Sequence, residues 1–172
     1  MLSRMAVAVM TDTTDFTTPD LSDAYPQAQV LRYQFQRFGL RQHFAGPVST
    51  VACFEDNSRV AEAVAEPGHG RVLLVDGRES LDRSLLGDNL ARSAAEQGWS
   101  GIVVMGAVRD VEIIDTIDIG VFSLGVIPCK TQKRGLGDRD VGISLREVFV
   151  QPGWWLYADR NGVVVSPRQL DA

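Results

Sequence analysis

The sequence predicts a mixed α/β fold that ends in an antiparallel portion. Three continuous apolar runs, at residues 71–77, 101–106 and 121–127, are typical of strands buried on both faces. Helical patterns at residues 85–98 and 111–117 lie between them, so this part of the chain alternates between strand and helix. The later part of the chain has short strands and a tight turn instead. These patterns indicate a mixed sheet with a substantial antiparallel portion.

The N-terminal part of the chain is expected to contribute two helices and a strand. Residues 21–25 predict a short helix with Asp20 as its cap. The β-rich run at residues 44–54 predicts a strand. Asn57 is expected to cap a second helix that continues to about Ala65.

The last third of the chain predicts antiparallel strands. Residues 141–145 and 148–150 are short apolar stretches, and residues 154–159 form a longer one. The dipeptide Asn161-Gly162 then leads into the apolar residues 163–165. Because Asn-Gly accepts positive φ angles, it favours a tight hairpin between these last two strands.

Composition and charge set limits on the class of protein. The chain has 172 residues, 45% of them hydrophobic, which is enough for one domain with a sizeable core. The net charge of −5 and the scattered Lys and Arg residues argue against direct binding of nucleic acid. Cys53 and Cys129 fit neither a disulfide framework nor a zinc site, so reduced thiols in the cytoplasm are expected.

No apolar run is long enough to span a membrane, and residues 6–10 are too few for a secretory signal. We predict that residues 1–18 form a flexible N-terminal extension, because residues 11–20 are rich in Thr and Asp. Residues 19–172 are then predicted to form a single domain.

Several common catalytic motifs are absent. The sequence contains no G-x-S-x-G nucleophile turn and no phosphate-binding loop of the G-x-x-x-x-G-K-[ST] kind. Gly135-Leu136-Gly137 lacks the third glycine of a dinucleotide-binding loop. The two histidines, His43 and His69, flank turns and share no metal-ligand spacing. A histidine-based catalytic triad or metal site is therefore not favoured.

The first candidate site is Gly87-Asp88-Asn89-Leu90, within or at the start of a predicted helix. Free backbone N–H groups and the helix dipole at such a position attract a carboxylate or phosphate group. The alternative is structural, because Asp and Asn are also common helix caps.

The second candidate site is Arg109-Asp110, which follows the apolar strand at residues 101–106. Ligands of α/β sheets gather at the carboxyl ends of strands. Arg can bind a carboxylate with two hydrogen bonds, and Asp offers hard oxygen ligands to Mg²⁺ or Mn²⁺. The alternative is that Asp110 caps the next helix while Arg109 pairs with a surface acid. The basic stretch at residues 130–134 is expected to be a solvated loop, or to border a neighbouring subunit's site in an oligomer.

Read together, several segments in one order resemble the family of regulator of ribonuclease activity A (RraA-like) proteins, which includes the 4-hydroxy-4-methyl-2-oxoglutarate aldolases. The resemblance covers most of the chain. The segments that carry it are Thr18–Tyr25, Phe44–Thr50, Cys53–Asn57, Val75–Gly77, Leu86–Ala91, Gly106–Asp110 and Tyr157–Asp159.

The resemblance implies a β/β/α fold of the swivelling-domain type and a homotrimer with active sites between subunits. It implies that residues 87–90 bind the substrate together with Arg109, and that Asp110 is the residue nearest a divalent metal. Twenty residues lie between Asp88 and Arg109, as in catalytically competent members. Some members carry a second acid three residues after the metal-binding Asp. This chain has Ile113 there, and Asp88 is the candidate to replace that acid.

Two functions follow as hypotheses. The first is a metal-dependent lyase that cleaves 4-hydroxy-4-methyl-2-oxoglutarate to pyruvate, and decarboxylates oxaloacetate through the same pyruvate enolate. Arg109 would neutralise negative charge on the substrate, and a water or hydroxide would serve as the base. The second is a non-catalytic trimer that binds and inhibits a ribonuclease. The presence of Asp110 favours the enzyme. Methyl transfer to a quinone is disfavoured, because the chain lacks a glycine-rich cofactor loop.

Overall fold

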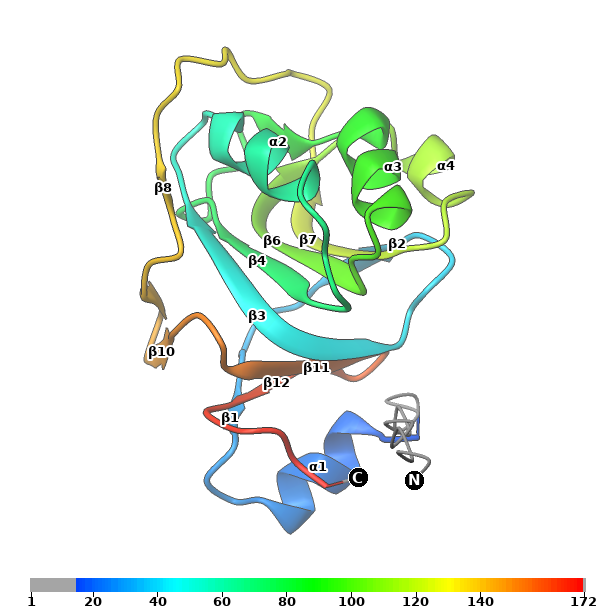
Figure 1. The fold of residues 1–172 in the computed structure, drawn as a ribbon, viewed down its shortest axis with the longest axis vertical. Helices are drawn as coiled ribbons and strands as arrows, with labels where there is room; N and C mark the ends of the chain where they lie inside the picture. The colour runs from blue at the N-terminus through cyan, green and yellow to red at the C-terminus, as the bar shows by residue number, and fades with distance from the viewer. Residues whose placement is uncertain (1–14, 172) are drawn as a thin grey trace, which may run out of the picture.

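The computed structural model describes residues 15–171, and a sheet of parallel strands lies at its centre. These strands are β3 (Phe44–Ala52), β4 (Val72–Asp76), β6 (Gly101–Val108) and β7 (Gly120–Val126), side by side in that order. Their carboxyl ends therefore lie along one edge of the sheet. Figure 1 shows this arrangement.

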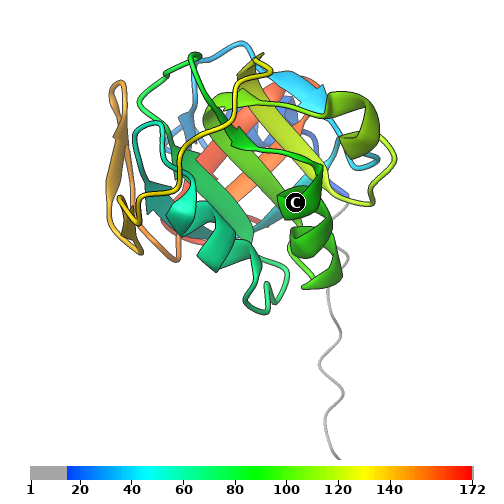
Figure 2. The same ribbon diagram turned by 90° about the horizontal axis from the view of Figure 1, so that it is seen from above.

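Antiparallel strands extend the sheet on both sides. Strand β11 (Trp155–Asp159) pairs with β3, and β12 (Gly162–Ser166) pairs with β11 through the predicted hairpin. Strand β1 (Gln29–Val30) pairs with β12, and β2 (Gln36–Phe38) pairs with β7 at the other end. Seen from above, β11 and β12 pass behind the parallel strands, so the sheet curls over itself (Figure 2).

Four short strands complete the β structure. Strand β5 (Ser84–Leu86) pairs with β6 in parallel, and β8 (Asp138–Arg139) pairs with β3 in antiparallel fashion. Strands β9 (Ile143–Leu145) and β10 (Val148–Val150) form a separate two-stranded sheet.

The helices are divided between two faces. Helices α2 (Ser58–Val64), α3 (Asp88–Glu96) and α4 (Val111–Ile114) cover one face of the parallel strands, whereas α1 (Thr18–Ala24) lies beside β11 and β12 (Figure 1). The layers are therefore helices, parallel strands and the curled antiparallel strands. This confirms the predicted mixed α/β architecture of the β/β/α type.

Two apolar layers explain why the central strands are continuously hydrophobic. In β4, Leu73 and Val75 pack toward the helices, while Val72 and Leu74 pack toward β11 and β12. Both faces of the strand are buried, so the alternation of polar and apolar residues seen in one-sided strands is absent. A polar side chain can reach solvent only where such a strand ends.

The helix expected over residues 85–98 begins at Asp88, because residues 84–86 form strand β5 beside β6. Leu85 and Leu86 are fully buried in that strand. A short apolar run at the start of a helical pattern does not distinguish the two structures. Strands β1 and β2 were not predicted, since they are only two and three residues long.

The first helix also begins earlier than expected. Thr17 is its N-cap and accepts a hydrogen bond from the backbone N–H of Asp20, so Asp20 is not the cap. Of the extension predicted for residues 1–18, residues 1–14 lie outside the described part of the chain. Phe16 and Thr18 are buried.

Asp159 attaches helix α1 to the sheet. Its carboxylate accepts hydrogen bonds from the backbone N–H and the hydroxyl of Thr18, each at 2.7 Å, and from the N–H of Asn161 at 2.8 Å. Burial alone would raise the pKa of Asp159, but these hydrogen bonds outweigh it and lower that pKa.

None of the helices in residues 15–171 is long and apolar enough to cross a membrane. Cys53 is buried, Cys129 is exposed, and both are free thiols.

We expect Asp159→Asn to lower the free energy of unfolding at pH 7 by about 2 kcal/mol, because charged hydrogen bonds to α1 are lost. The lowered pKa means that this stabilisation is complete above the unfolded-state pKa of about 3.9 and is lost as the pH falls below it. Urea denaturation should therefore show a smaller difference from the parent protein at pH 3 than at pH 7. Asp23→Asn, on the exposed side of α1, is the control, and an equal loss in both variants would contradict this role.

Candidate functional site

The loops at the carboxyl ends of the parallel strands surround a cavity of about 620 Å³. Every residue of the two sequence-predicted sites lines this cavity. These residues are Gly87, Asp88, Asn89, Leu90, Arg109 and Asp110. The two segments come together because β5 and β6 are neighbouring parallel strands that end at the same edge.

Arg109 and Asp110 occupy the first positions after the fully buried strand β6. The backbone N–H of Arg109 donates to the carbonyl oxygen of Leu86 at 3.0 Å, which ties the two segments together. The side chains of Arg109 and Asp110 are 37% and 36% exposed, so a ligand in the cavity can reach both. The guanidinium Nε lies 3.7 Å from Asp110 Oδ2.

Asp110 has the backbone conformation of a left-handed residue, with φ 57° and ψ 37°. It stands at the N-cap position of α4, but its side chain makes no capping hydrogen bond. The alternative of a plain helix cap is therefore wrong for the side chain. A left-handed conformation in a residue other than glycine costs on the order of 1 kcal/mol, and such strain gathers at functional sites.

The N-terminus of α3 faces the Asp110 carboxylate. The backbone N–H of Asp88 points at Asp110 Oδ2 across 3.5 Å, and Gly87, the N-cap residue, has no side chain to satisfy the first N–H groups of the helix. These donors and the helix dipole favour an anion at this end. The Asp88 carboxylate is itself paired weakly with Arg92, at 3.8 Å.

The importance of Gly87 is one of space and not of backbone conformation, since its φ of −122° is open to any residue. A Cβ atom at this position would lie 2.8 Å from Asp110 Oδ2 and 3.6 Å from the Cγ and Nε atoms of Arg109. The missing side chain thus leaves room for the Arg109-Asp110 pair against the helix.

Six further residues line the cavity and were not among the predicted site residues. They are Asn57, Ser84, Lys130, Thr131, Gln132 and Lys133. The basic stretch was expected to be a solvated loop or to border a neighbour's site. Lys130, Gln132 and Lys133 are indeed exposed, but they line this chain's own cavity. Their position in the loop that follows strand β7 was the available sequence signal.

The loop after β7 is brought to the cavity by pairing with β5. Ser84 forms a parallel bridge with Lys130, and its N–H donates to the carbonyl oxygen of Cys129 at 2.7 Å. This pairing is between residues 46 positions apart.

Asn57 was expected to cap helix α2, and its side chain does not do so. Its amide oxygen instead accepts a hydrogen bond from the Thr131 hydroxyl at 2.7 Å, and its amide nitrogen donates to the carbonyl oxygen of Leu85 at 3.2 Å. Asn57 therefore joins the loop after β7 to strand β5 beside the cavity. The first N–H of the helix, on Ser58, is bound by Asp56 at 2.9 Å.

Comparison with known proteins assigns the family. The model of the RraA-like family, described as Aldolase/RraA, matches residues 18–165. The chain belongs to the RraA-like family. The resemblance stated from the sequence is thereby confirmed.

Relatives of several kinds share this RraA-like fold. A Hahella chejuensis protein, provisionally named a 4-hydroxy-4-methyl-2-oxoglutarate aldolase, is 51% identical over 156 residues, covering 90% of this chain and 95% of its own. A Pseudomonas aeruginosa protein with the same provisional name is also 51% identical, covering 90% of this chain and 96% of its own.

Solved structures carry two other descriptions. The RNA-processing inhibitor RraA from Thermus thermophilus has a TM-score of 0.89 at 45% identity, covering 92% of this chain and 96% of its own. A Geobacillus kaustophilus protein described as a 2-dimethylmenaquinone methyltransferase has a TM-score of 0.88 at 42% identity, covering 90% and 97%.

The charges around the RraA-like cavity suit an anionic ligand together with a cation. Three basic residues, Arg109, Lys130 and Lys133, and two acids, Asp88 and Asp110, line it. Within residues 15–171 no group of three or more His, Cys, Asp and Glu side chains is placed to hold a metal. A single open carboxylate still fits Mg²⁺, which keeps several waters and is completed by oxygen atoms of a substrate. The Asp110 carboxylate lines the cavity and its side chain is partly exposed, so it is open to such an ion.

We expect Gly87→Ala to displace the Asp110 carboxylate while changing the free energy of unfolding by less than about 1 kcal/mol, because the clash involves the end of a flexible side chain. A crystal structure of the variant and urea denaturation would measure both effects. Gly98→Ala is the opposite case, since Gly98 has open space but φ +80°. The Gly98 variant should lose about 1 kcal/mol of its free energy of unfolding and leave Asp110 in place. An unmoved Asp110 in the Gly87 variant would disprove the spatial argument.

Proposed function

We propose that this chain is a divalent-metal-dependent lyase that cleaves 4-hydroxy-4-methyl-2-oxoglutarate to pyruvate and also decarboxylates oxaloacetate. The observation that carries the proposal is the Arg109-Asp110 pair, held at the end of β6 against the N-terminus of α3. The provisional aldolase names of relatives at 51% identity support it.

Both reactions break a bond to C3 of a 2-oxo acid. In the retro-aldol reaction the C4 hydroxyl loses its proton, the C3–C4 bond breaks, and C4 leaves as the carbonyl carbon of one pyruvate. The electron pair stays on C3 as the enolate of a second pyruvate, which is then protonated at C3. Oxaloacetate loses CO₂ from the same position and leaves the same enolate. Stabilising that enolate is therefore the common requirement.

Asp110 is the residue that would hold Mg²⁺ or Mn²⁺, with Asp88 as the candidate second acid. When bound, such a cation supplies Lewis-acid stabilisation of negative charge on the 2-oxo acid.

The residues of the chain bind and orient the substrate. Arg109 is proposed to pair with the C1 carboxylate or the developing enolate oxygen, because a guanidinium donates two parallel hydrogen bonds to such groups. The N–H groups of residues 87–90 would orient the same end of the substrate, and orientation can lower a barrier by several kcal/mol. Lys130 and Lys133, which also line the cavity, are proposed to bind the second carboxylate of a dicarboxylic substrate.

The acceptor of the C4 hydroxyl proton is proposed to be a water molecule or hydroxide. Neither histidine lines the cavity. His43 stacks on Phe16 and contacts its carbonyl oxygen at 2.6 Å, and His69 is exposed in a turn. Both histidines therefore lie outside the proposed site of the reaction.

We expect Asp110→Asn to lower pyruvate release from both substrates by at least about a hundredfold, because the variant loses the anionic oxygen that would hold the cation. A chelator should lower pyruvate release by the parent protein to the same extent, and added Mg²⁺ should restore that activity. A coupled assay for pyruvate measures both. Glu112→Gln, an exposed acid in the first turn of α4, is the matched control and should retain activity. Turnover indifferent to chelator and to Asp110→Asn would refute the proposal.

A second candidate is a regulator that binds and inhibits a ribonuclease, as a homotrimer of this chain. The likeness to the Thermus thermophilus RNA-processing inhibitor, with a TM-score of 0.89, favours it. Such binding would use the outer surface of the assembly, and the cavity would not be needed.

We expect any inhibition of a ribonuclease to be the same for the parent protein and Asp110→Asn, because binding between protein surfaces does not require this carboxylate. An RNA-cleavage assay with both proteins, alongside the pyruvate assay, separates the two functions. Inhibition that disappears with the Asp110 carboxylate would instead link regulation to the cavity.

A further inference from the structure

The loop between β7 and β8 has little regular backbone pairing, although it contributes four residues to the cavity. Apart from the bridge at Lys130, residues 127–137 belong to no strand or helix. Beyond Cys129, most of their backbone N–H and C=O groups must therefore find side-chain or solvent partners. The position of the loop depends on which partners it has.

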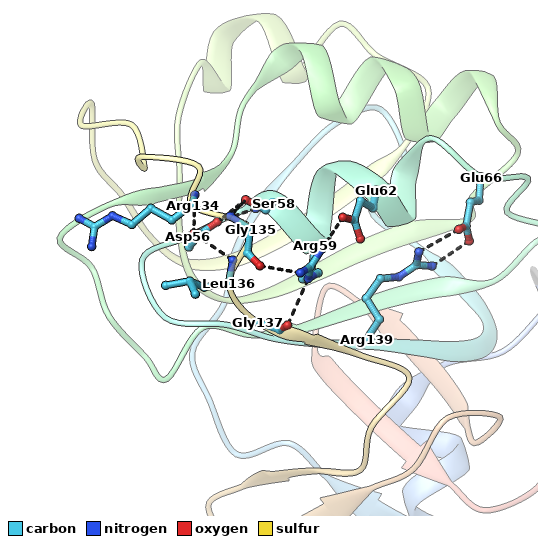
Figure 3. Close-up of polar contacts among 10 residues, drawn as sticks. All are labelled: Asp56, Ser58, Arg59, Glu62, Glu66, Arg134, Gly135, Leu136, Gly137 and Arg139. Carbon is cyan, nitrogen blue, oxygen red and sulfur yellow. Dashed lines mark hydrogen bonds and ion pairs between the residues drawn. The ribbon is translucent and has the colours of Figure 1, made fainter.

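The carboxylate of Asp56 is the central partner. Its Oδ2 atom accepts hydrogen bonds from the backbone N–H groups of Arg134 at 2.8 Å and Leu136 at 3.3 Å. Its Oδ1 atom accepts from the N–H and the hydroxyl of Ser58, at 2.9 and 2.6 Å. Asp56 is only 2% exposed. One buried carboxylate thus links the loop to the start of α2, as Figure 3 shows.

Ser58 and Arg59 extend this link. The Ser58 hydroxyl accepts a hydrogen bond from the N–H of Gly135 at 3.0 Å. The Arg59 guanidinium donates to the carbonyl oxygens of Gly135 and Gly137, at 2.5 and 3.1 Å (Figure 3). Three consecutive N–H groups of the loop and two of its carbonyl groups are therefore bound by Asp56, Ser58 and Arg59, at the start of α2.

Asp56 itself does not line the cavity, but residues next to Asp56 and to its hydrogen-bond partners do. Lys133 immediately precedes Arg134, whose N–H is bound by Asp56. On the other side, Thr131 bonds to Asn57, the residue after Asp56. Residues 56–59 therefore bind the loop through residues 131 and 134–137, while Lys130 to Lys133 line the cavity.

We infer that Asp56 is a positioning residue for the reaction: without touching the substrate, it holds Lys133 at the cavity through the backbone N–H groups of Arg134 and Leu136. This inference rests on the proposed function, in which the loop binds the substrate. It concerns substrate binding and not the bond-breaking step. Arg109 and Asp110 follow strand β6, and the hydrogen bond from Arg109 to the loop goes to the carbonyl oxygen of Pro128, at 3.4 Å, and not to residues 130–136.

The protonation state of Asp56 suits this role. Burial alone would raise the pKa of Asp56, but the hydrogen bonds from Ser58, Arg134 and Leu136 outweigh it and lower that pKa to about 2. The carboxylate is therefore ionised at neutral pH, and all four of its hydrogen bonds are received by an anion.

The test is Asp56→Asn in the full chain. An amide has one acceptor oxygen, so the variant cannot hold both Ser58 and the loop N–H groups. We expect KM for oxaloacetate and the dissociation constant of pyruvate, measured by calorimetry with Mg²⁺, to rise about tenfold, while kcat changes less than about threefold. Amide hydrogen exchange of residues 134–136 should become at least about tenfold faster.

The matched control is Glu66→Gln. Glu66 pairs with Arg139 through two hydrogen bonds, at 2.8 and 2.7 Å, beyond the other end of α2 (Figure 3). Its partner lies in β8, and the hydrogen bonds of the pair join Glu66 to Arg139 and not to residues 130–137. Loss of this pair should leave KM and the exchange of the loop unchanged.

Ser58→Ala is the milder variant if Asp56→Asn does not fold. It removes the acceptor of the Gly135 N–H and one bond to Asp56, and we expect KM to rise about threefold. An unchanged KM in the folded variants, or an equal rise in Glu66→Gln, would overturn the positioning role. A parent protein that releases no pyruvate would refute the proposed function. If Asp56→Asn still weakened pyruvate binding in that case, Asp56 would remain a positioning residue for binding.

Discussion

The burial of strand β6 along its whole length is the constraint on which the candidate site depends. All eight residues of the strand are buried, between the helices on one side and the curled antiparallel strands on the other. Charged side chains are excluded from such a strand, because burying an unpaired charge is costly. Arg109 and Asp110 can appear only where the strand leaves the two layers, and that point faces the N-terminus of α3. The apolar packing thus fixes where the polar pair stands.

The two sides of the cavity are held by different kinds of interaction. Arg109, Asp110 and residues 87–90 directly follow paired strands, so backbone ladders position them. Residues 131–133 lie in a loop that is paired with β5 at Lys130 and is otherwise held by side chains, among them Asp56, Asn57 and Arg59. Side-chain hydrogen bonds exchange with water more readily than a buried ladder does. We therefore expect the Arg109-Asp110 pair to be held more rigidly than residues 131–133.

Sequence patterns failed where local and long-range interactions compete for the same residues. Leu85 and Leu86 fit a helical period, but pairing with β6 makes them part of a strand. Asn57 has the residue type and position of a helix cap, yet its amide bonds to Thr131 and Leu85, while Asp56 binds the first N–H of α2. In both cases the local preference contributes less free energy than a contact to a distant segment of the chain.

The sequence by itself determined the α/β class, the buried central strands, the C-terminal hairpin and the two segments that carry residues 87–90 and Arg109-Asp110. Apolar periodicity and the ends of buried strands are local properties, so one chain segment is enough to reveal them. Only the tertiary structure decided that Asn57 and residues 130–133 complete the same cavity, and that Asp56 holds that loop. Those contacts join residues more than seventy positions apart, and no spacing within a single segment records them.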